Sequence, residues 1–202
     1  HPPGYPLWIG VLKVLAGLGV DPLHGMVGLA ILGGAIGTAW MVLLAARLAP
    51  EEARLQTGAC TGLFAAAPYA ADPLLWFYGE LPLIYGVEGG LTVVLAWAAT
   101  RMEEGRRHFL LACGLFALAG GLRQSTMALP APLLLFGTWR TWRRGRLTPG
   151  LFFGGASLGA VIVRACLVPL CVAGGGYGAY RRNSSEHFAV LLPQTSILYG
   201  AG

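Results

Sequence analysis

The stretch Gly120-Gly121-Leu122-Arg123-Gln124-Ser125-Thr126 decides how this chain is arranged. It interrupts an otherwise apolar run from Phe109 to Trp139, and Pro130 and Pro132 follow it. Irregular backbone is tolerated at membrane depth only where it is buried in protein or lines a watery cavity. We therefore predict two short helices with a turn between them, which cross a membrane twice. The alternative is one tilted span.

The composition around this stretch is that of a membrane protein. Of the 202 residues, 55% are hydrophobic and only 11% are charged, whereas soluble domains are about a quarter charged. One helical span needs about 20 apolar residues. We predict an all-α polytopic bundle whose six spans cover residues 24–48, 55–71, 81–100, 109–139 (crossed twice) and 149–172.

Shorter signals complete the expected fold. Residues 7–18 are apolar except for Lys13 and too short to span, which indicates a helix lying at the membrane interface. Asp21-Pro22 and Asp72-Pro73 are typical of capped helix starts. Gly33 and Gly37 place small residues on one helix face, where another helix can pack closely.

Residues 1–202 read as a single membrane domain. The chain begins at His1 without a methionine and stops at Gly202 within an apolar stretch, which favours a fragment truncated at both ends.

The arginines lie in short turns between the spans. If the chain crosses twice at 109–139, these turns share one side, which the bias of positive charge toward the cytoplasm makes the inner side. The net charge of +5 has this origin and does not indicate a nucleic-acid partner. The arginines concerned are Arg47, Arg54, Arg101, Arg106, Arg107, Arg140, Arg143, Arg144 and Arg146.

The same arrangement brings the chemically unusual residues together on the outer side. We expect a site there that contains His1, Tyr5, Tyr78, Glu80, Glu88, Arg123 and Gln124.

Each member of this site also has a structural alternative. Glu88 lies inside a span, where an ionisable group is costly and a functional role is the default reading. It could instead form a structural pair with Arg123 or Arg164. The guanidinium of Arg123 suits phosphate oxygens, but it could also extend to lipid headgroups. Glu80 could be a solvated acid at the interface, and a lone histidine such as His1 is more often neither a metal ligand nor an acid–base group.

Three motifs in order resemble those of a known family. They are His1-Pro2-Pro3-Gly4-Tyr5-Pro6-Leu7, Trp76-Phe77-Tyr78-Gly79-Glu80 and Gly120-Gly121-Leu122-Arg123-Gln124-Ser125. The chain resembles polytopic glycosyltransferases of the GT-C class, and is similar to bacterial dolichyl-phosphate-mannose–protein mannosyltransferases and lipid A aminoarabinose transferases.

This resemblance implies an inverting sugar transfer from a polyprenyl-phosphate donor to a lipid, glycan or protein acceptor. The site would face outward from the bacterial inner (plasma) membrane. It implies that the principal base lies upstream of His1, that Glu80 or Glu88 acts as a second acid, and that a divalent cation such as Mg or Mn assists. Two other classes fit the composition: a polytopic transporter, and a non-catalytic lipid-binding membrane subunit.

Overall fold

Helix α2 (Pro22–Leu48) begins at the predicted cap. The Asp21 carboxylate accepts hydrogen bonds from the backbone N–H groups of Leu23 at 3.0 Å and His24 at 3.1 Å. Pro22 occupies the first turn, where its missing N–H leaves nothing unsatisfied. The prediction of a capped start at Asp21-Pro22 is therefore confirmed.

The computed structural model describes residues 6–73, 84–123, 127–173, 175–179, 181–182 and 185–186. Over these ranges the chain is helical and contains no strand. The expected all-α fold class is confirmed at this level. The elements are α1 (Pro6–Gly17), α2, α3 (Glu51–Ala70), α5 (Tyr85–Thr100), the 3-10 turn η1 (Met102–Glu104), α6 (Arg106–Leu122), α7 (Ala131–Arg143) and α8 (Pro149–Ala173).

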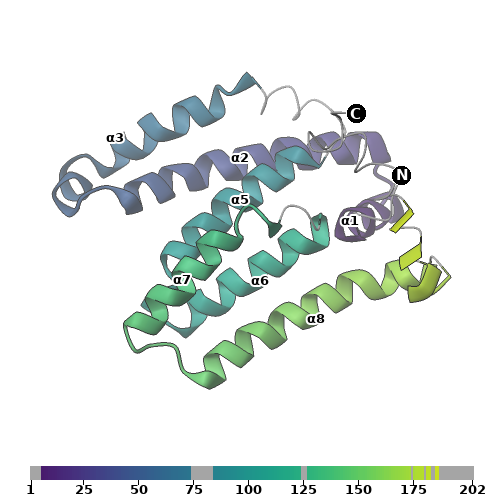
Figure 1. Cartoon of the computed structure of the whole chain (residues 1–202). Coiled ribbons are helices and arrows are strands. Elements are labelled where there is room, and N and C mark those ends of the chain that lie inside the picture. The colour runs from purple at the N-terminus through teal and green to yellow at the C-terminus, as the bar shows by residue number, and fades with distance from the viewer. Residues whose placement is uncertain are drawn as a thin grey trace, which may run out of the picture.

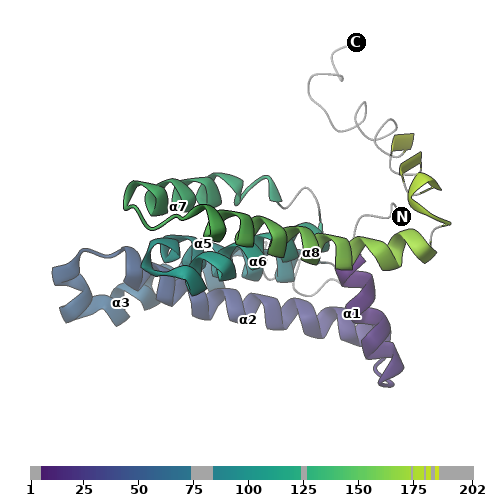
Figure 2. The same ribbon diagram turned by 90° about the horizontal axis from the view of Figure 1, so that it is seen from below.

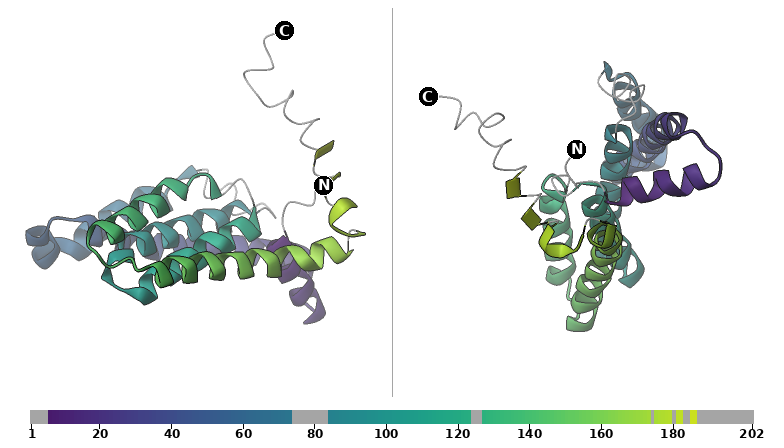
Figure 3. Two further views of the ribbon diagram at one scale, coloured as in Figure 1. Left: turned by 60° about the horizontal axis from the view of Figure 1, so that its bottom comes forward. Right: turned by 90° about the vertical axis from the view of Figure 1, so that its right-hand side faces the viewer.

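The helices form an elongated bundle (Figure 1). Across the bundle the order is α3, α2, α5, α6, α8, and α7 packs over α5, η1 and α6. Helix α1 lies across one end at a steep angle to α2 (Figure 2), as a short interfacial helix would. The end-on view in Figure 3 shows α1 extending sideways from the bundle.

The closest packing in the bundle joins α2 to α5 through glycines. A Cβ added to Gly33 would lie 2.6 Å from Val87 Cα, and one added to Gly86 would lie 2.5 Å from the Ala30 oxygen. A Cβ on Gly90 would overlap the Gly33 oxygen. The predicted small-residue face of α2 is thus confirmed, and α5 supplies a matching face spaced four residues apart.

The chain reverses direction after α6, as the sequence predicts. Helix α6 ends at Leu122 and α7 begins at Ala131. The carboxyl end of α7 returns to the turn that precedes α6, because Arg140 and Arg144 both contact Glu103. The interrupted run 109–139 therefore forms two helices that run antiparallel.

Helix α7 ends in a turn that requires glycine. Gly145 has φ +67°, a conformation that other residues rarely adopt. Its N–H donates to the Trp142 oxygen at 2.8 Å, and the Arg146 N–H donates to the Thr141 oxygen at 3.1 Å. This double hydrogen bond is the Schellman motif, and it turns Arg146 back toward the bundle.

Two helices are long and apolar enough to cross a membrane: α2, and α8 over Pro149–Pro169. Only 17% and 6% of their most apolar windows are buried, whereas the core helix of a soluble protein is mostly buried. Both helices therefore favour a membrane location. The remaining predicted spans do not reach this criterion. The described parts of α5, α6 and α7 contain 16, 17 and 13 residues, and α3, with 20 residues, is not apolar enough.

Candidate functional site

Arg123 lies at the end of the bundle opposite the arginine-rich turns. It caps the carboxyl end of α6 in extended conformation, with φ −155° and ψ 129°, and its N–H donates to the Ala119 oxygen at 3.0 Å. Its guanidinium carbon lies 5.8 Å from the centroid of the Tyr85 ring, at the start of α5. This distance is within the range of a cation–π contact. The aromatic ring thus holds the charge at the helix end.

Glu88 lies on α5 one turn after Tyr85 and is partly buried. Its backbone oxygen accepts a hydrogen bond from Thr92 Oγ1 at 2.8 Å. Glu88 is a neighbour of Tyr85 because residues three apart share a helix face. Arg123 is a neighbour of Tyr85 through the cation–π contact. The structural alternative of a Glu88–Arg164 ion pair is wrong, since Arg164 forms no ion pair with any residue the structure describes.

The other predicted members of this site lie outside the described residues. They are His1, Tyr5, Tyr78, Glu80 and Gln124. The second predicted helix start, at Asp72-Pro73, leads directly into the same range. The elements that flank them converge all the same, because α1 begins at Pro6 against α6, where a Cβ added to Gly121 would lie 3.5 Å from Leu7 Cβ. The structure therefore brings together Glu88 and Arg123, and leaves the rest of the site as a prediction.

A partly open cavity of about 380 Å³ lies beside the carboxyl end of α6. Its walls are apolar side chains and one glycine from α1, α2, α5 and α6. Along α5 the lining runs from Val87 to Val94, and along α6 from Leu115 to Leu122. Seven positions of a helix correspond to about 10 Å, so the cavity is elongated along the bundle axis.

Two charged residues follow lining residues of this cavity in the chain, although neither of them lines it. Leu122 and Val87 line it, and the next residues in the chain are Arg123 and Glu88. The cavity itself can accept an apolar group such as a lipid tail, and Arg123 lies at the same end of the bundle. Sequence reasoning identified the two charged residues but missed the cavity, which depends on how four separate helices pack.

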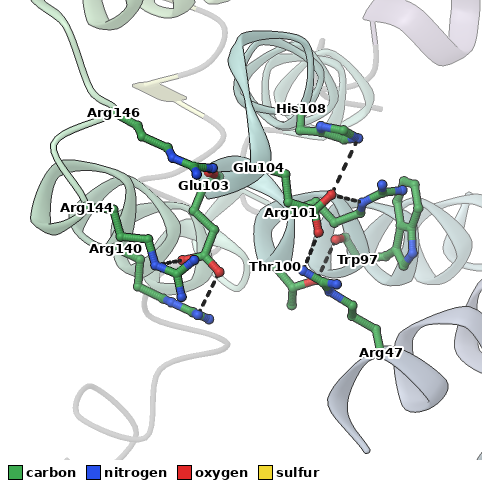
Figure 4. A network of polar contacts seen from close by, with 10 residues as sticks. All are labelled: Arg47, Trp97, Thr100, Arg101, Glu103, Glu104, His108, Arg140, Arg144 and Arg146. Atoms are coloured by element: carbon green, nitrogen blue, oxygen red, sulfur yellow. Dashed lines mark hydrogen bonds and ion pairs between the residues drawn. The ribbon is translucent and has the colours of Figure 1, made fainter. Parts of the chain in front are cut away.

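At the opposite end of the bundle, Glu103 and Glu104 join arginines from several turns in one network of polar contacts (Figure 4). The Glu103 side chain is buried. Arg140 Nη2 donates to its Oε1 at 2.7 Å, and Arg144 Nε lies 3.1 Å from its Oε2, an ion pair without hydrogen-bond geometry. Arg146 Nη1 donates to the Glu103 backbone oxygen at 2.6 Å.

Glu104 ties the other side of this network together. It forms ion pairs with Arg47 of α2 and with Arg101, whose Nε lies 2.7 Å from its Oε2. His108 Nε2 is 3.9 Å away. Partial burial acts to raise the pKa of the Glu104 carboxyl, but the Arg101 hydrogen bond and the nearby positive charges outweigh it and lower that pKa below its usual value.

The Glu103–Glu104 cluster, meaning these two acids with Arg47, Arg101, Arg140, Arg144 and Arg146, shows that the turns share one end. The sequence-based expectation that these arginines lie on a common side is confirmed for these five residues. Their acidic partners were missed. The sequence signal that could have identified these partners is the pair of adjacent acids, Glu103-Glu104, within an arginine-rich turn.

The lowered pKa of Glu104 predicts how the free energy of unfolding depends on pH in the acidic range. Since this pKa is lower in the folded than in the unfolded chain, the ionised carboxylate stabilises the fold above the unfolded-state pKa. That contribution is lost as the pH falls through the folded-state pKa. We expect Glu104→Gln to lower the free energy of unfolding by about 1 kcal/mol at neutral pH and by nothing in strong acid.

Denaturation of the purified protein in detergent, repeated across acidic pH, measures this difference. Glu51→Gln is the control, because Glu51 is exposed at the start of α3. Stability curves of wild type and Glu104→Gln that remain parallel at every pH would contradict the assignment.

Within the described ranges, no group of three His, Cys, Asp or Glu residues is placed to hold a metal ion. No family model, curated protein or solved structure matches the chain. Any function must therefore be argued from the residues and their arrangement.

Proposed function

We propose that this chain is part of a membrane glycosyltransferase that takes a sugar from a polyprenyl-phosphate donor. The observation that carries the proposal is the apolar cavity, whose lining residues Leu122 and Val87 directly precede Arg123 and Glu88 in the chain. Cavities of this size and character are typical of small-ligand sites. An isoprenoid tail suits its walls, and the Arg123 guanidinium, at the same end of the bundle, suits the phosphate.

The proposal includes the membrane arrangement. Helices α2 and α8 would span the bilayer fully, and α3, α5, α6 and α7 would complete a GT-C-like bundle of six crossings, with α1 at the interface. The Glu103–Glu104 cluster would then mark the cytoplasmic side of a bacterial inner membrane. Arg123 would lie near the outer surface, where the acceptor would be a lipid, a glycan or a protein.

In the proposed reaction an acceptor oxygen bonds to the anomeric carbon of the sugar as that carbon's bond to the phosphate oxygen breaks. The acceptor proton passes to a carboxylate, and polyprenyl phosphate leaves with the bonding electron pair. Arg123 would stabilise the negative charge that grows on the phosphate. Glu88 or Glu80 would act as an acid beside the sugar or as a ligand of Mg or Mn, which prefer oxygen ligands.

Arg123 provides the direct test. We expect Arg123→Ala in the full-length protein to reduce transfer of radiolabelled sugar by about tenfold, because one charge-assisted contact to the leaving phosphate is lost. Arg106→Ala, an exposed arginine at the opposite end, is the matched control and should leave transfer unchanged. Undiminished turnover by both Arg123→Ala and Glu80→Gln would contradict these assignments.

The same cavity also suits a non-catalytic lipid-binding subunit. Retention of labelled polyprenyl phosphate by the purified protein separates the two functions. An enzyme should both retain and turn over the donor, and Arg123→Ala should weaken both. Retention that depends on Arg123 without sugar transfer would favour the lipid-binding subunit.

A further inference from the structure

Helix α8 contacts the bundle along one face only. Gly155, Gly159, Ile162 and Cys166 meet α6, where a Cβ added to Gly121 would lie 2.7 Å from Cys166 Sγ. Much of the rest of α8 is exposed, including Phe153 at 66%, Val161 at 64% and Val172 at 76%. A helix that can cross a membrane thus presents a long outward face.

Arg164 lies in the middle of that outward face. It is exposed, and it is two positions from both Ile162 and Cys166, which places it about 160° around the helix from the α6 contact. Val161 and Val168, three and four positions away, share its face. Within the part of the chain that the structure describes, Arg164 forms no hydrogen bond, ion pair or ring contact.

The depth of Arg164 makes this lack of a partner costly. It lies nine residues, or about 13.5 Å, before the carboxyl end of α8 at Ala173 and fifteen residues after its start at Pro149. Side chains on a helix tilt toward its amino end, so the side chain of Arg164 leans away from the nearer membrane surface. A cation in hydrocarbon normally pairs with an opposite charge.

The outward face around Arg164 also permits close approach. Ser157 and Ala160, one to two turns away, are both exposed and small. Small side chains let helix backbones come together in membranes. Among the described residues, Cys113 is a titratable side chain of α6 that lies against α8, at Gly155, and no described carboxylate forms an ion pair with Arg164.

We propose that the outward face of α8 is the docking surface for a membrane-spanning helix of a partner protein, and that this helix carries one Asp or Glu at the depth of Arg164. The carboxylate pairs with the guanidinium, and the small residues allow the two backbones to approach. This inference does not depend on the glycosyltransferase proposal.

A synthetic probe tests the chemistry of this face. The full-length protein, labelled with a donor fluorophore, is reconstituted in phosphatidylcholine vesicles with acceptor-labelled Leu-Ala transmembrane peptides. One peptide carries a single Glu at the depth of Arg164, and the other carries Leu there. At alkaline pH, energy transfer should show about tenfold tighter association of the Glu peptide.

The variants decide the outcome. Arg164→Leu makes α8 more apolar, so membrane insertion is preserved, and it should remove the preference for the Glu peptide. Arg143→Leu, which changes an exposed arginine at the other end, should keep it. Equal association of both peptides, or a preference that survives Arg164→Leu, would overturn the proposal. Retention of added phosphatidylglycerol through Arg164, without preference for Glu, would assign the residue to lipid and overturn it equally.

Discussion

Gly33→Leu should separate α2 from α5 and destabilise the folded bundle by about 3 kcal/mol or more. Forcing extra methylenes into a close-packed interior typically costs about 1–3 kcal/mol. Here the new Cβ alone would lie 2.6 Å from Val87 Cα and 2.7 Å from the Gly86 oxygen. Because both are backbone atoms, no rotamer change can make room. A loss of this size is a large part of a typical stability of about 5–15 kcal/mol.

A control on the same helix makes this prediction sharp. Gly28 is also within α2, but a Cβ added there would meet nothing within 4 Å. Gly28→Leu should therefore unfold at the same detergent composition as wild type, or later. Titration from a mild detergent into dodecyl sulfate measures both variants. The Trp40–Trp97 pair, whose ring centroids are 6.3 Å apart across α2 and α5, provides the fluorescence signal. Equal transitions for the two variants would refute the glycine contact.

Glu103→Ala should destabilise the protein by about 3 kcal/mol and release α7 first. Removing one partner of a buried ion pair costs about 3–5 kcal/mol because the other charge is left uncompensated. The lower end applies because Arg140 and Arg144 are 37% and 54% exposed and can reach water. The loss of the carboxylate leaves Arg140 and Arg144 without an acidic partner, whereas the hydrogen bond from Arg146 to the backbone oxygen of residue 103 is retained.

Hydrogen exchange locates this effect. Amides of α7 should exchange much faster in Glu103→Ala, whereas those of α2, which is tied to the network through Glu104, should change less. Glu51→Gln, at an exposed position, supplies the background change for removing one negative charge. Unaltered protection of α7 would show that the Glu103–Glu104 cluster does not hold that helix.

Helix positions followed from local signals in the sequence. Asp21-Pro22 fixed the start of α2, and the glycines and prolines between 120 and 132 identified the reversal between α6 and α7. Both signals are chemical properties of a few adjacent residues, namely a side-chain acceptor for free amides and a ring that lacks an N–H. Such signals survive without knowledge of the rest of the fold.

Contacts between helices could not be predicted in the same way. Gly33 and Gly37 indicated that a partner helix would pack closely, but the choice of Gly86 and Gly90 depends on the relative rotation and depth of two helices. The contacts of the η1 acids and the apolar cavity also depend on how separate helices pack, so they could not be predicted either. Of the predicted site, the structure describes only Glu88 and Arg123, which lie at the same end of the bundle. The other members lie outside the described ranges.

The ion pair between Arg47 and Glu104 also has a consequence for biosynthesis. The two residues are 57 positions apart, as 104 minus 47, and both belong to one network in the folded protein. At about 5–20 residues per second, Glu104 leaves the ribosome roughly 3–11 s after Arg47. During that interval the ion pair between Arg47 and Glu104 cannot form. The contact that joins α2 to η1 therefore forms only after α5 has been synthesised.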